Sequence, residues 1–346
     1  MKQLITIVAC CVFSISAGAA EDNPSLADLY QRVGPSVVEI ATIQEVISDK
    51  GPAKRVRSGG LGSGFLVSED GLIMTAAHVV QMAEDVAVRW VNGEVSKAKI
   101  VSSNPNADVA LLQAEDVPDT IKPLVLADSD PVRVGDEVFI IGAPRKYANT
   151  LTVGYVSARR KPDDLFGGIE PVELLQTDAA INEGNSGGPM FNMVGEVIGV
   201  VSHIFSQSGG SQGLGFVVTS NMARIEMLEK KPFWSGIDGF QLKDGWAKIF
   251  NLPQNAGILI EGVAAGSASA RIGLRPGSYR AEIEGQKLTV GGDVILAIQG
   301  IPVGAEDFGP KVEQAANALG EDGLLELKVL REGKVISLSM PIGELR

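Results

Sequence analysis

The chain has 346 residues, a formal net charge of −12, 41 glycines and 5% aromatic residues. It is long enough for two or three domains that each bury a core. The many glycines and few aromatic residues favour a turn-rich β protein over a helical one. The negative charge argues against nucleic acid as the main partner, because binding phosphates requires concentrated lysine and arginine.

The first twenty residues are typical of an export signal. Lys2 supplies a positive start, residues 4–15 form an apolar stretch, and Ala17-Gly18-Ala19 offers small residues for cleavage. The apolar stretch is too short to span a bilayer. We therefore expect residues 1–20 to be a signal peptide that is removed on export, and no stable membrane span in the chain.

An alternative interpretation of this segment is a lipoprotein signal, because Ile7-Val8-Ala9-Cys10 is similar to a lipoprotein processing box. Cleavage at Cys10 would leave almost no hydrophobic segment before the cysteine, so we expect no lipid anchor there. Cys10 and Cys11 are the two cysteines of the chain. Once the signal is removed, the chain would contain no disulfide and would be held by packing alone.

Between residues 36 and 238 short β-rich runs alternate with Gly, Pro, Asn and Asp, which predicts an antiparallel sandwich or barrel. The polar stretch Ser48–Gly60 predicts a surface loop. Ser220–Lys231 predicts a helix with Met222, Ile225 and Leu228 on one face. The clearest strands are 37–40, 64–67, 86–90, 110–112, 137–141 and 197–201.

From residue 233 the pattern changes to a mixed α+β unit. Asp307–Leu319 predicts a helix with Val312, Ala316 and Leu319 on one side. Arg331–Lys334 predicts a hairpin turn between the last two strands. The expected strands are 257–260, 293–298, 325–330 and 335–340.

The most informative motif is Gly184-Asn185-Ser186-Gly187-Gly188-Pro189. Small neighbours let a carbonyl group approach the hydroxyl of Ser186 closely, as a nucleophile requires. A tight turn also directs successive backbone amides into one concavity, where they can hold an oxyanion. For the glycines alone, an ordinary glycine-rich turn is the better explanation, so the motif needs partners.

A serine nucleophile requires a base, and the chain has two histidines, His78 and His203. His78 follows an apolar strand and has small neighbours, which suits an imidazole at a cleft, although a lone histidine is more often structural. Asp108 precedes an apolar strand, where a carboxylate can fix the imidazole tautomer and stabilise imidazolium. An acid at the start of a strand is also commonplace.

The order of these residues along the chain separates two fold classes. In α/β-hydrolases the serine comes first and the histidine last. Here the only later histidine is His203, and no βαβ alternation surrounds it. The order His78, Asp108, Ser186 is that of chymotrypsin-like enzymes, so we favour the latter class.

Three linked motifs carry a resemblance to a known family: TAAHVV at 75–80, DVALL at 108–112 and QTDAAINEGNSGGP at 176–189. In sequence, order and spacing they resemble the HtrA/DegP family of serine proteases, and the likeness runs from about Tyr30 to the C-terminus. The resemblance implies a mainly β fold: a chymotrypsin/trypsin-like double β-barrel protease domain at 21–232 and a smaller α+β PDZ domain at 233–346. It implies His78 as general base and then acid, Asp108 as its orienter, and Ser186 as nucleophile.

The resemblance also implies an oxyanion hole on the backbone amides of Gly184 and Ser186, with Asn185 between them. One departure concerns the residue before Gly184. Family members usually carry proline there, whereas this chain has Glu183. A charged, flexible residue at this position can alter the resting shape of the oxyanion loop. We expect structural roles for two remaining candidates, Asp178 and His203.

In trypsin-like enzymes the residue six before the nucleophile lies at the base of the primary specificity pocket, and here it is Ala180. The other wall of the pocket is expected from Leu214, Gly215 and Phe216. No carboxylate is present there to receive arginine or lysine. We therefore expect cleavage after small or medium aliphatic residues.

The C-terminal unit resembles a PDZ domain, which binds a peptide by adding it as a strand and captures its terminal carboxylate. The implied binding residues are Ser235, Gly236 and Ile237 in the carboxylate-binding loop, and Val312 and Ala316 on the helix. Ordinary helix packing explains these two helix residues equally well. The unit departs from the usual pattern by an insertion at 277–290, to which the sequence assigns no role.

The resemblance implies a periplasmic serine endopeptidase of protein quality control that cleaves unfolded or misfolded exported proteins and senses C-terminal peptides. It also implies a homotrimer, formed through N-terminal segments such as 27–30. Two alternatives stay open: a holdase-type chaperone or scaffold whose triad is incidental, and a processing protease with one native target that a PDZ-bound peptide activates. The sequence has no metal-ligand cluster or cofactor motif, so we expect no cofactor and no metal.

Overall fold

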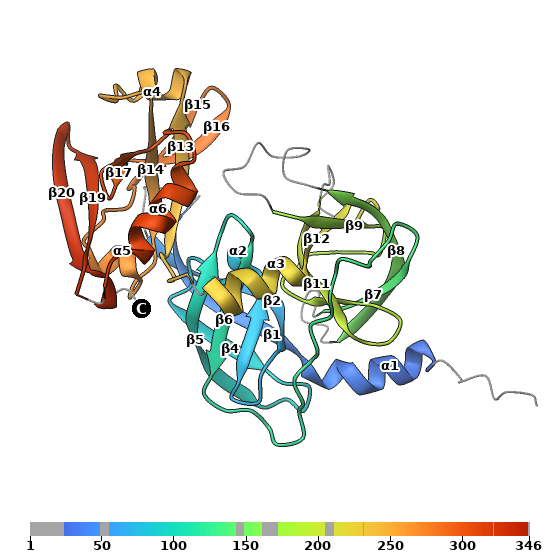
Figure 1. Ribbon diagram of the computed structural model, residues 1–346. Coiled ribbons are helices and arrows are strands. Elements are labelled where there is room, and N and C mark those ends of the chain that lie inside the picture. Colours follow the sequence, from blue (N-terminus) through green and yellow to red (C-terminus); the bar gives the residue numbers. More distant parts are fainter. Residues whose placement is uncertain are drawn as a thin grey trace, which may run out of the picture.

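The computed structural model describes residues 24–48, 55–142, 149–160, 172–204, 211–230, 232–320 and 322–344. The chain forms two β-barrels that lie side by side, and a separate sheet that lies beyond the first barrel (Figure 1). The expected signal peptide, with Cys10 and Cys11, lies outside the described residues. No helix in the described part of the chain has the length and apolar character that crossing a bilayer requires.

Both barrels are closed and six-stranded, which confirms the expected double-barrel architecture. The first closes in the order β1-β2-β3-β6-β5-β4 and the second in the order β10-β11-β12-β9-β8-β7. The strands of the first are β1 (Val37–Ile47), β2 (Arg55–Leu66), β3 (Leu72–Thr75), β4 (Asp85–Arg89), β5 (Val95–Asn104) and β6 (Val109–Ala114). Those of the second are β7 (Glu137–Gly142), β8 (Thr150–Arg160), β9 (Leu174–Thr177), β10 (Pro189–Phe191), β11 (Val197–Ile204) and β12 (Gly215–Thr219).

Each barrel has its own apolar interior, and a third apolar cluster joins the two barrels. In the joining cluster Phe65 and Met74 of the first barrel belong to the same buried group as Phe139 and Phe191 of the second. The rings of Phe139 and Phe191 stack with centroids 4.8 Å apart. Burial of this size fixes the two barrels against each other, and the seam between them is where residues from both can meet.

The expected loop at Ser48–Gly60 is wrong from Arg55 onward, because β2 begins there. The hairpin of β1 and β2 extends to the pair Ile47 and Arg55. Residues 55–60 are exposed or only partly buried, so no alternation of apolar and polar residues marks them as a strand. Pairing with β1, rather than burial, makes this segment extended.

The third sheet has the strand order β13-β14-β17-β19-β20, with β18 beside β17. Its turn at Arg331–Lys334 is as expected: Arg331 pairs with Lys334, and Glu332 and Gly333 have φ of 50° and 76°, as a type I′ turn requires. The unassigned insertion at 277–290 forms a hairpin of its own, β15 (Tyr279–Ile283) and β16 (Gln286–Val290). The other strands are β13 (Ile237–Lys243), β14 (Ala256–Val263), β17 (Val294–Ile298), β18 (Ile301–Pro302), β19 (Leu324–Arg331) and β20 (Lys334–Pro341).

The helices are short and lie at the edges of these sheets (Figure 1). The α-helices are α1 (Leu26–Val33), α2 (Ala77–Val80), α3 (Ser220–Arg224), α4 (Gly245–Ile249), α5 (Ala268–Arg271) and α6 (Phe308–Asn317). Single 3₁₀ turns lie at Gly34–Ser36 and Ile342–Glu344, and a π-helical segment lies at Ile225–Lys230.

The helix expected at Ser220–Lys231 is present, and Met222 and Leu228 of its expected face pack against the joining cluster, but Ile225 does not. Ala223 and Met227 are buried, whereas Ile225 is 40% exposed. The chain changes from α to π geometry at Ile225. Because a π-helix has more residues per turn, it rotates the later side chains away from the face that a 3.6-residue period predicts.

The first helix packs within its own chain. Leu29 is fully buried in the cluster that joins the barrels, and the hydroxyl of Tyr30 donates to the carbonyl of Asn149 at 2.6 Å. Arg32 donates to the carbonyl of Val194. Part of the segment expected at trimer contacts is therefore already used inside the protomer.

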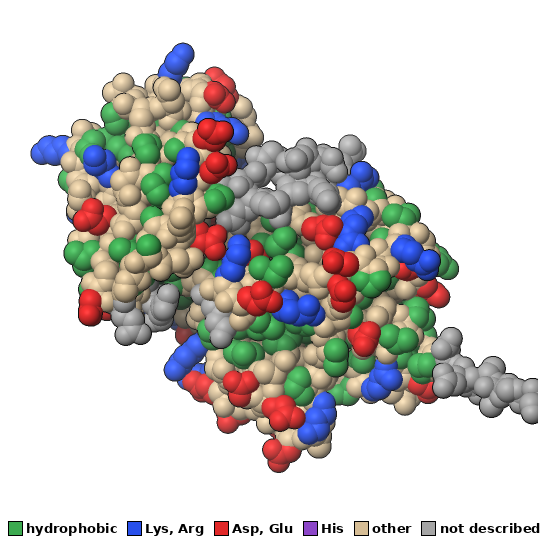
Figure 2. Space-filling view, viewed as in Figure 1, with side chains coloured by type: hydrophobic (Ala, Val, Ile, Leu, Met, Phe, Trp, Pro, Cys, Tyr) green, Lys and Arg blue, Asp and Glu red, His purple; other side chains and the backbone are tan. Residues whose placement is uncertain are grey.

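The surface carries its charges in mixed order. On the face shown in Figure 2, acidic and basic side chains are interspersed over the barrels and the third sheet. This distribution, together with the net charge of −12, offers no concentrated basic area on that face.

Candidate active site

The first barrel brings His78 and Asp108 together. His78 lies on α2, directly after β3, and Asp108 lies directly before β6. Strands β3 and β6 are paired through Thr75 and Ala110, so the residues just outside this pair are neighbours. Nδ1 of His78 lies 2.9 Å from Oδ1 of Asp108 and 3.0 Å from Oδ2, and the backbone amide of His78 donates to Oδ1 at 3.0 Å.

The backbone of Asp108 is in the left-handed region, with φ of 52°. Aspartate tolerates this conformation better than most residues, but it still costs free energy. The turn carries Asp108 back over α2, where its carboxylate receives both donors of His78. The strained backbone and the paired side chains occur at the same residue, as is common at active sites.

The two side chains shift each other's pKa. Burial acts to lower the pKa of His78, but the hydrogen bond and the charge of Asp108 outweigh burial, so this pKa lies above its usual value. Burial acts to raise the pKa of Asp108, but hydrogen bonds from His78 and Ser202 and the charge of His78 bring it below its usual value. Asp108 is therefore a stable anion next to an imidazole of increased basicity.

Ser186 comes from the second barrel, in the turn between β9 and β10. Its carbonyl accepts from the amide of Ser63 in the first barrel at 2.8 Å, so its backbone is tied across the seam. Its hydroxyl donates to the carbonyl of Ser202 at 3.2 Å. Among the described residues, no hydrogen bond joins the hydroxyl of Ser186 to the imidazole of His78. Catalytic hydrogen bonds are often incomplete without substrate.

The turn before Ser186 leaves two backbone amides without an acceptor. The amide of Asn185 donates to the carbonyl of Asn182 at 3.0 Å, and Gly184 between them has φ of 98°, which is the pattern of a type II turn. Within the described part of the chain, the amides of Gly184 and Ser186 donate to no protein acceptor. The side chain of Asn185 is buried, and that of Glu183 is exposed.

Gly187 is required by space as well as by conformation. Its φ is 83°, and a Cβ atom there would lie 2.2 Å from the carbonyl oxygen of Ser63 and 2.2 Å from Oγ1 of Thr75. The amide of Gly187 donates to the carbonyl of Val201 at 2.7 Å. Gly187 therefore lets the turn with Ser186 dock tightly between the two barrels.

Ser202 and His203 lie next to Asp108, and only His203 had been considered from the sequence. The hydroxyl of Ser202 donates to Oδ2 of Asp108 and lies 2.9 Å from Nδ1 of His203. The ring of His203 stacks on Phe216 with centroids 5.1 Å apart. A serine in an apolar strand gives no sequence signal for such a contact, which depends on strand pairing far along the chain.

The residues expected for the specificity pocket lie in two neighbouring segments. A Cβ atom on Gly215 would lie 2.6 Å from Cδ1 of Ile181, the residue next to Ala180. Phe216 is 6% exposed and belongs to the joining core, whereas Leu214 is 38% exposed. Ala180 is partly buried. In the same turn, Oδ1 of Asp178 accepts from the amide of Tyr155 at 2.6 Å, which is consistent with a structural role.

The residues expected for the peptide groove also come together. Ser235, Ile237, Val312 and Ala316 line one pocket of 130 Å³ between the start of β13 and α6, and the other lining residues are almost all apolar. Gly236 has φ of 64°, and a Cβ atom there would lie 2.2 Å from Cβ of Ser267. The strand β13 pairs on one side with β14 and is an edge of the sheet, so its other edge can receive an added strand.

Gln81 links this loop to the first barrel. It follows α2, and its amide nitrogen donates to the hydroxyl of Ser235 at 3.0 Å and to the carbonyl of Ile237 at 3.2 Å. Its amide oxygen accepts from the hydroxyl of Ser103 at 2.8 Å. The indole nitrogen of Trp234 donates to the carbonyl of Gln81 at 2.9 Å.

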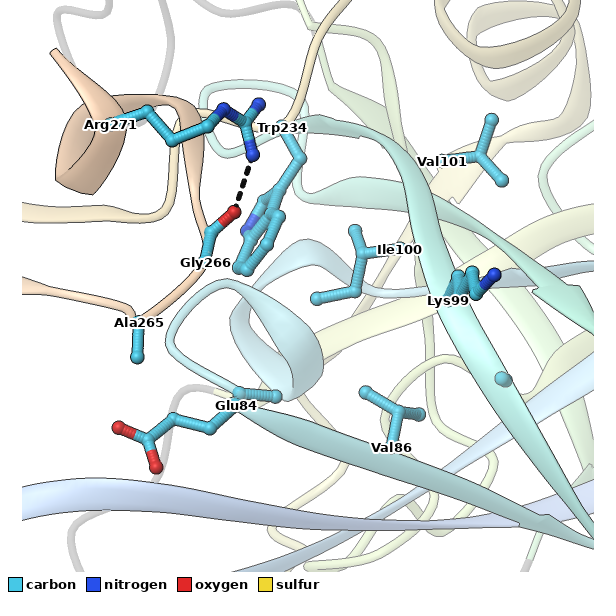
Figure 3. A pocket seen from close by; sticks show the side chains of 11 residues that line it. Glu84, Val86, Lys99, Ile100, Val101, Trp234, Ala265, Gly266 and Arg271 are labelled. Atoms are coloured by element: carbon cyan, nitrogen blue, oxygen red, sulfur yellow. Dashed lines mark hydrogen bonds between the residues drawn. The ribbon is translucent and has the colours of Figure 1, made fainter. Parts of the chain in front are cut away.

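Next to this link, a cavity of 330 Å³ separates the first barrel from the third sheet. Figure 3 shows the indole of Trp234 opposite Ile100, with Arg271 bonded to the carbonyl of Gly266 beside the indole. Neither Gln81 nor this cavity could be predicted from the sequence, because both depend on how the parts of the chain dock.

Comparisons with known proteins agree with this geometry. The family model described as trypsin-like peptidase domain matches residues 62–200. A probable periplasmic serine endoprotease, DegP-like, from Hahella chejuensis is 32% identical over 96% of this chain and 73% of its own length. The periplasmic pH-dependent serine endoprotease DegQ of Escherichia coli is 34% identical over 77% of this chain and 62% of its own length.

Solved structures give the same result. The HtrA-type protease AlgW with tripeptide is 30% identical, with a TM-score of 0.53, and the match covers 91% of this chain and 96% of that one. The same protease with a decapeptide is 29% identical, with a TM-score of 0.53. The likeness therefore extends over both barrels and the third sheet.

Proposed function

Because the chain belongs to the HtrA/DegP family of serine endoproteases, we propose that His78, Asp108 and Ser186 are the triad of this serine endopeptidase. Ser186 attacks the scissile carbonyl as His78 accepts its proton, and His78 returns that proton to the leaving amine. Asp108 holds the imidazole with its proton on Nδ1 and stabilises the imidazolium. The 2.9 Å contact between His78 and Asp108, at the seam that also carries Ser186, supports these roles.

The proposed oxyanion hole consists of the amides of Gly184 and Ser186. Within residues 184–187, these two amides find no protein acceptor among the described residues, whereas the amides of Asn185 and Gly187 are already bonded. A substrate carbonyl that enters here receives two preoriented donors as its oxygen becomes negative. The hydroxyl of Ser186 then has to leave the carbonyl of Ser202 and donate to His78 instead.

The test of this mechanism is labelling by a serine-directed fluorophosphonate together with digestion of casein. Ser186→Ala is expected to abolish both. Ser337→Ala, on an exposed position of β20, is the matched control and should retain both. Casein digestion that persists in Ser186→Ala would contradict the proposed nucleophile.

The proposed substrates are unfolded or misfolded exported proteins, cleaved after small or medium aliphatic residues. Ala180 supports this preference, because it places a methyl group rather than a carboxylate where the family has the base of its pocket. Mapping of cleavage sites in a denatured protein mixture tests it. Ala180→Asp should add cleavage after lysine and arginine, whereas Ala180→Ser should not. Unchanged sites in Ala180→Asp would show that Ala180 does not line the pocket.

We further propose that residues 233–346 form a PDZ domain that senses C-terminal peptides. Its terminal carboxylate site is the loop Ser235–Ile237, and the apolar pocket between Ile237 and α6 takes the last side chain. Gln81 supports a role in sensing, because its side chain bonds Ser235 and Ile237 while its backbone continues α2, three residues after His78. A peptide that moves the loop would act on the helix that holds the base.

A peptide with an apolar C-terminal residue should bind the groove and raise the rate of casein digestion. The same peptide with an amidated C-terminus is the matched control and should do neither. Gln81→Met should bind the free-acid peptide with similar affinity but lose the stimulation. If the peptide still stimulates this variant, Gln81 does not couple peptide binding to the rate of digestion.

Localisation and assembly follow from the same family membership as proposals. The relatives are named as periplasmic, and residues 1–20 are proposed to direct this chain to the periplasm. A homotrimer is proposed through the exposed residues of α1 and its neighbours.

A holdase-type chaperone is the alternative from another class of function, and it predicts that Ser186→Ala retains all of the protective activity on unfolded protein.

A further inference from the structure

Ser202 and His203 lie at an irregularity of β11 beside the candidate triad. The pairing of β11 with β12 shifts register between Val201 and Ile204, and the two residues stand within this shift. Such irregularities redirect side chains and are frequent next to active sites. Here the irregularity lets Ser202 contact Asp108 through its hydroxyl and Ser186 through its carbonyl.

The number of protons on Ser202 fixes the direction of its bonds. A serine hydroxyl has one hydrogen, and a carboxylate can only accept. The hydrogen of Ser202 is therefore committed to Oδ2 of Asp108. The contact of 2.9 Å between this hydroxyl and Nδ1 of His203 can then be a hydrogen bond only if Nδ1 carries a proton and donates.

The surroundings of His203 favour the neutral ring in that tautomer. Nε2 is buried, and the ring stacks on Phe216. Burial lowers the pKa of His203, the nearby charge of Asp108 raises it, and His78 lowers it, with a net effect below the usual value for histidine. Asp108 and His78 are thus the titratable groups that act on it, and both belong to the triad.

We propose that His203 is a positioning residue of the triad, which donates from Nδ1 to Ser202 and thereby fixes the hydroxyl of Ser202 on Asp108. The inference rests on the proposed roles of His78, Asp108 and Ser186. It assigns a chain of four side chains, in which His203 donates to Ser202, Ser202 donates to Asp108, and His78 donates to the same carboxylate.

The physical effect of His203 is on the basicity of Asp108. A hydroxyl that accepts one hydrogen bond becomes a stronger donor in the next, because the bonds polarise each other. Without His203, Ser202 donates more weakly and its hydroxyl can rotate away. The carboxylate of Asp108 then accepts the hydrogen bond from His78 more strongly, which raises the pKa of His78. The carboxylate is also less firmly held in position.

Three substitutions separate the hydrogen bond from the shape of the ring. His203→Asn keeps a donor near the position of Nδ1 but loses the ring. His203→Leu has nearly the shape of asparagine but no donor. His203→Phe keeps a ring to stack on Phe216 but has no donor. All three are made in the full chain, and their thermal unfolding midpoints are compared with the wild type.

The measurements are kcat and KM on casein and the rate of fluorophosphonate labelling of Ser186 as a function of pH. His203→Leu and His203→Phe are expected to lower kcat by about threefold to tenfold with little change in KM, the size of one hydrogen bond. Their labelling should fall off at a higher pH than in the wild type. His203→Asn should stay close to the wild type in kcat and in this pH dependence.

A double-mutant comparison tests whether His203 acts through Ser202. Adding His203→Phe to Ser202→Ala should cause no further loss, since the hydroxyl that His203 orients is already absent. The inference is overturned if His203→Phe retains both kcat and the wild-type pH dependence, if His203→Asn loses as much as His203→Leu, or if the double variant shows additive losses. Absence of labelling in the wild type would overturn the triad itself, whereas labelling in the wild type with unchanged His203 variants would overturn this inference alone.

Discussion

The two barrels differ in how many of the expected hydrogen bonds their candidate active-site residues have already formed. The first barrel holds His78 and Asp108 in full contact, with the backbone of Asp108 in the left-handed region and both donors of His78 on one carboxylate. The second barrel holds Ser186 with its hydroxyl on the carbonyl of Ser202 and with an exposed glutamate in the proposed oxyanion turn. The proposed base is thus already paired with its carboxylate, and the proposed nucleophile is the part that has to change its hydrogen bond.

The largest effect is expected from the assembled side. Asp108→Asn should lower kcat by about 10⁴-fold, because an amide that donates to His78 stabilises the wrong tautomer. Asp178→Asn is the matched control, since this acid bonds the amide of Tyr155 rather than a triad member, and should retain activity. The measurement is casein digestion. A small loss in Asp108→Asn would mean that the contact in the first barrel is not the catalytic one.

On the second barrel, Gly187→Ala is expected to lower kcat by about 10²-fold to 10³-fold, the cost of misplacing an oxyanion donor. The added Cβ would meet the backbone of Ser63 at 2.2 Å, so the turn with Ser186 must move. Gly93→Ala has a similar left-handed φ of 87° but meets no atom within 4 Å, and it isolates the cost of the conformation. Equal losses in the two variants would contradict close docking as the cause.

The raised pKa of His78 predicts the acidic limit of activity. His78 must be neutral to accept a proton, so kcat/KM should fall about tenfold per pH unit below this pKa, which lies above the usual value for histidine. Because Asp108 raises this pKa, the remaining activity of Asp108→Asn should be lost at a lower pH than that of the wild type. A pH profile of kcat/KM tests both statements. A wild-type activity that falls only below the usual pKa of histidine would contradict a raised pKa of His78.

The smallest effect is expected from the adjustable turn. Glu183 occupies the second position of the type II turn Asn182–Asn185, where proline is favoured. Glu183→Pro should stabilise the turn by about 0.4–1 kcal/mol and raise kcat by about twofold to fivefold. Glu183→Ala removes the charge without fixing the backbone and serves as control. If both variants raise kcat equally, charge rather than conformation sets the resting shape.

The sequence was sufficient for features that depend on local patterns. Three short motifs predicted the partners His78, Asp108 and Ser186, and short β-rich runs predicted some of the strands of each barrel. The structure places His78 and Asp108 in contact, but whether the triad acts as expected stays a prediction. The hairpin turn at Arg331–Lys334 was predicted from its position between two expected strands, because a two-residue loop leaves the backbone few choices.

Features that depend on docking could not be predicted in this way. Ser202 gave no signal, because its role comes from an irregular pairing within β11 and from a carboxylate 94 residues away. Gln81 bonds residues more than 150 positions later. The exposure of Ile225 in the helix at 220–230 was not predicted, because a change to π geometry cannot be derived from a 3.6-residue period.

The packing of α1 has a consequence for how the chain acquires its structure. Tyr30 bonds a carbonyl 119 residues later, and Arg32 bonds one 162 residues later. This helix precedes both barrels in the chain, but the surface that buries Leu29 does not exist until the second barrel has formed. Contacts of such long range form slowly and late. We therefore expect α1 to stay exposed until the second barrel has formed, so its docking should be one of the last steps of folding.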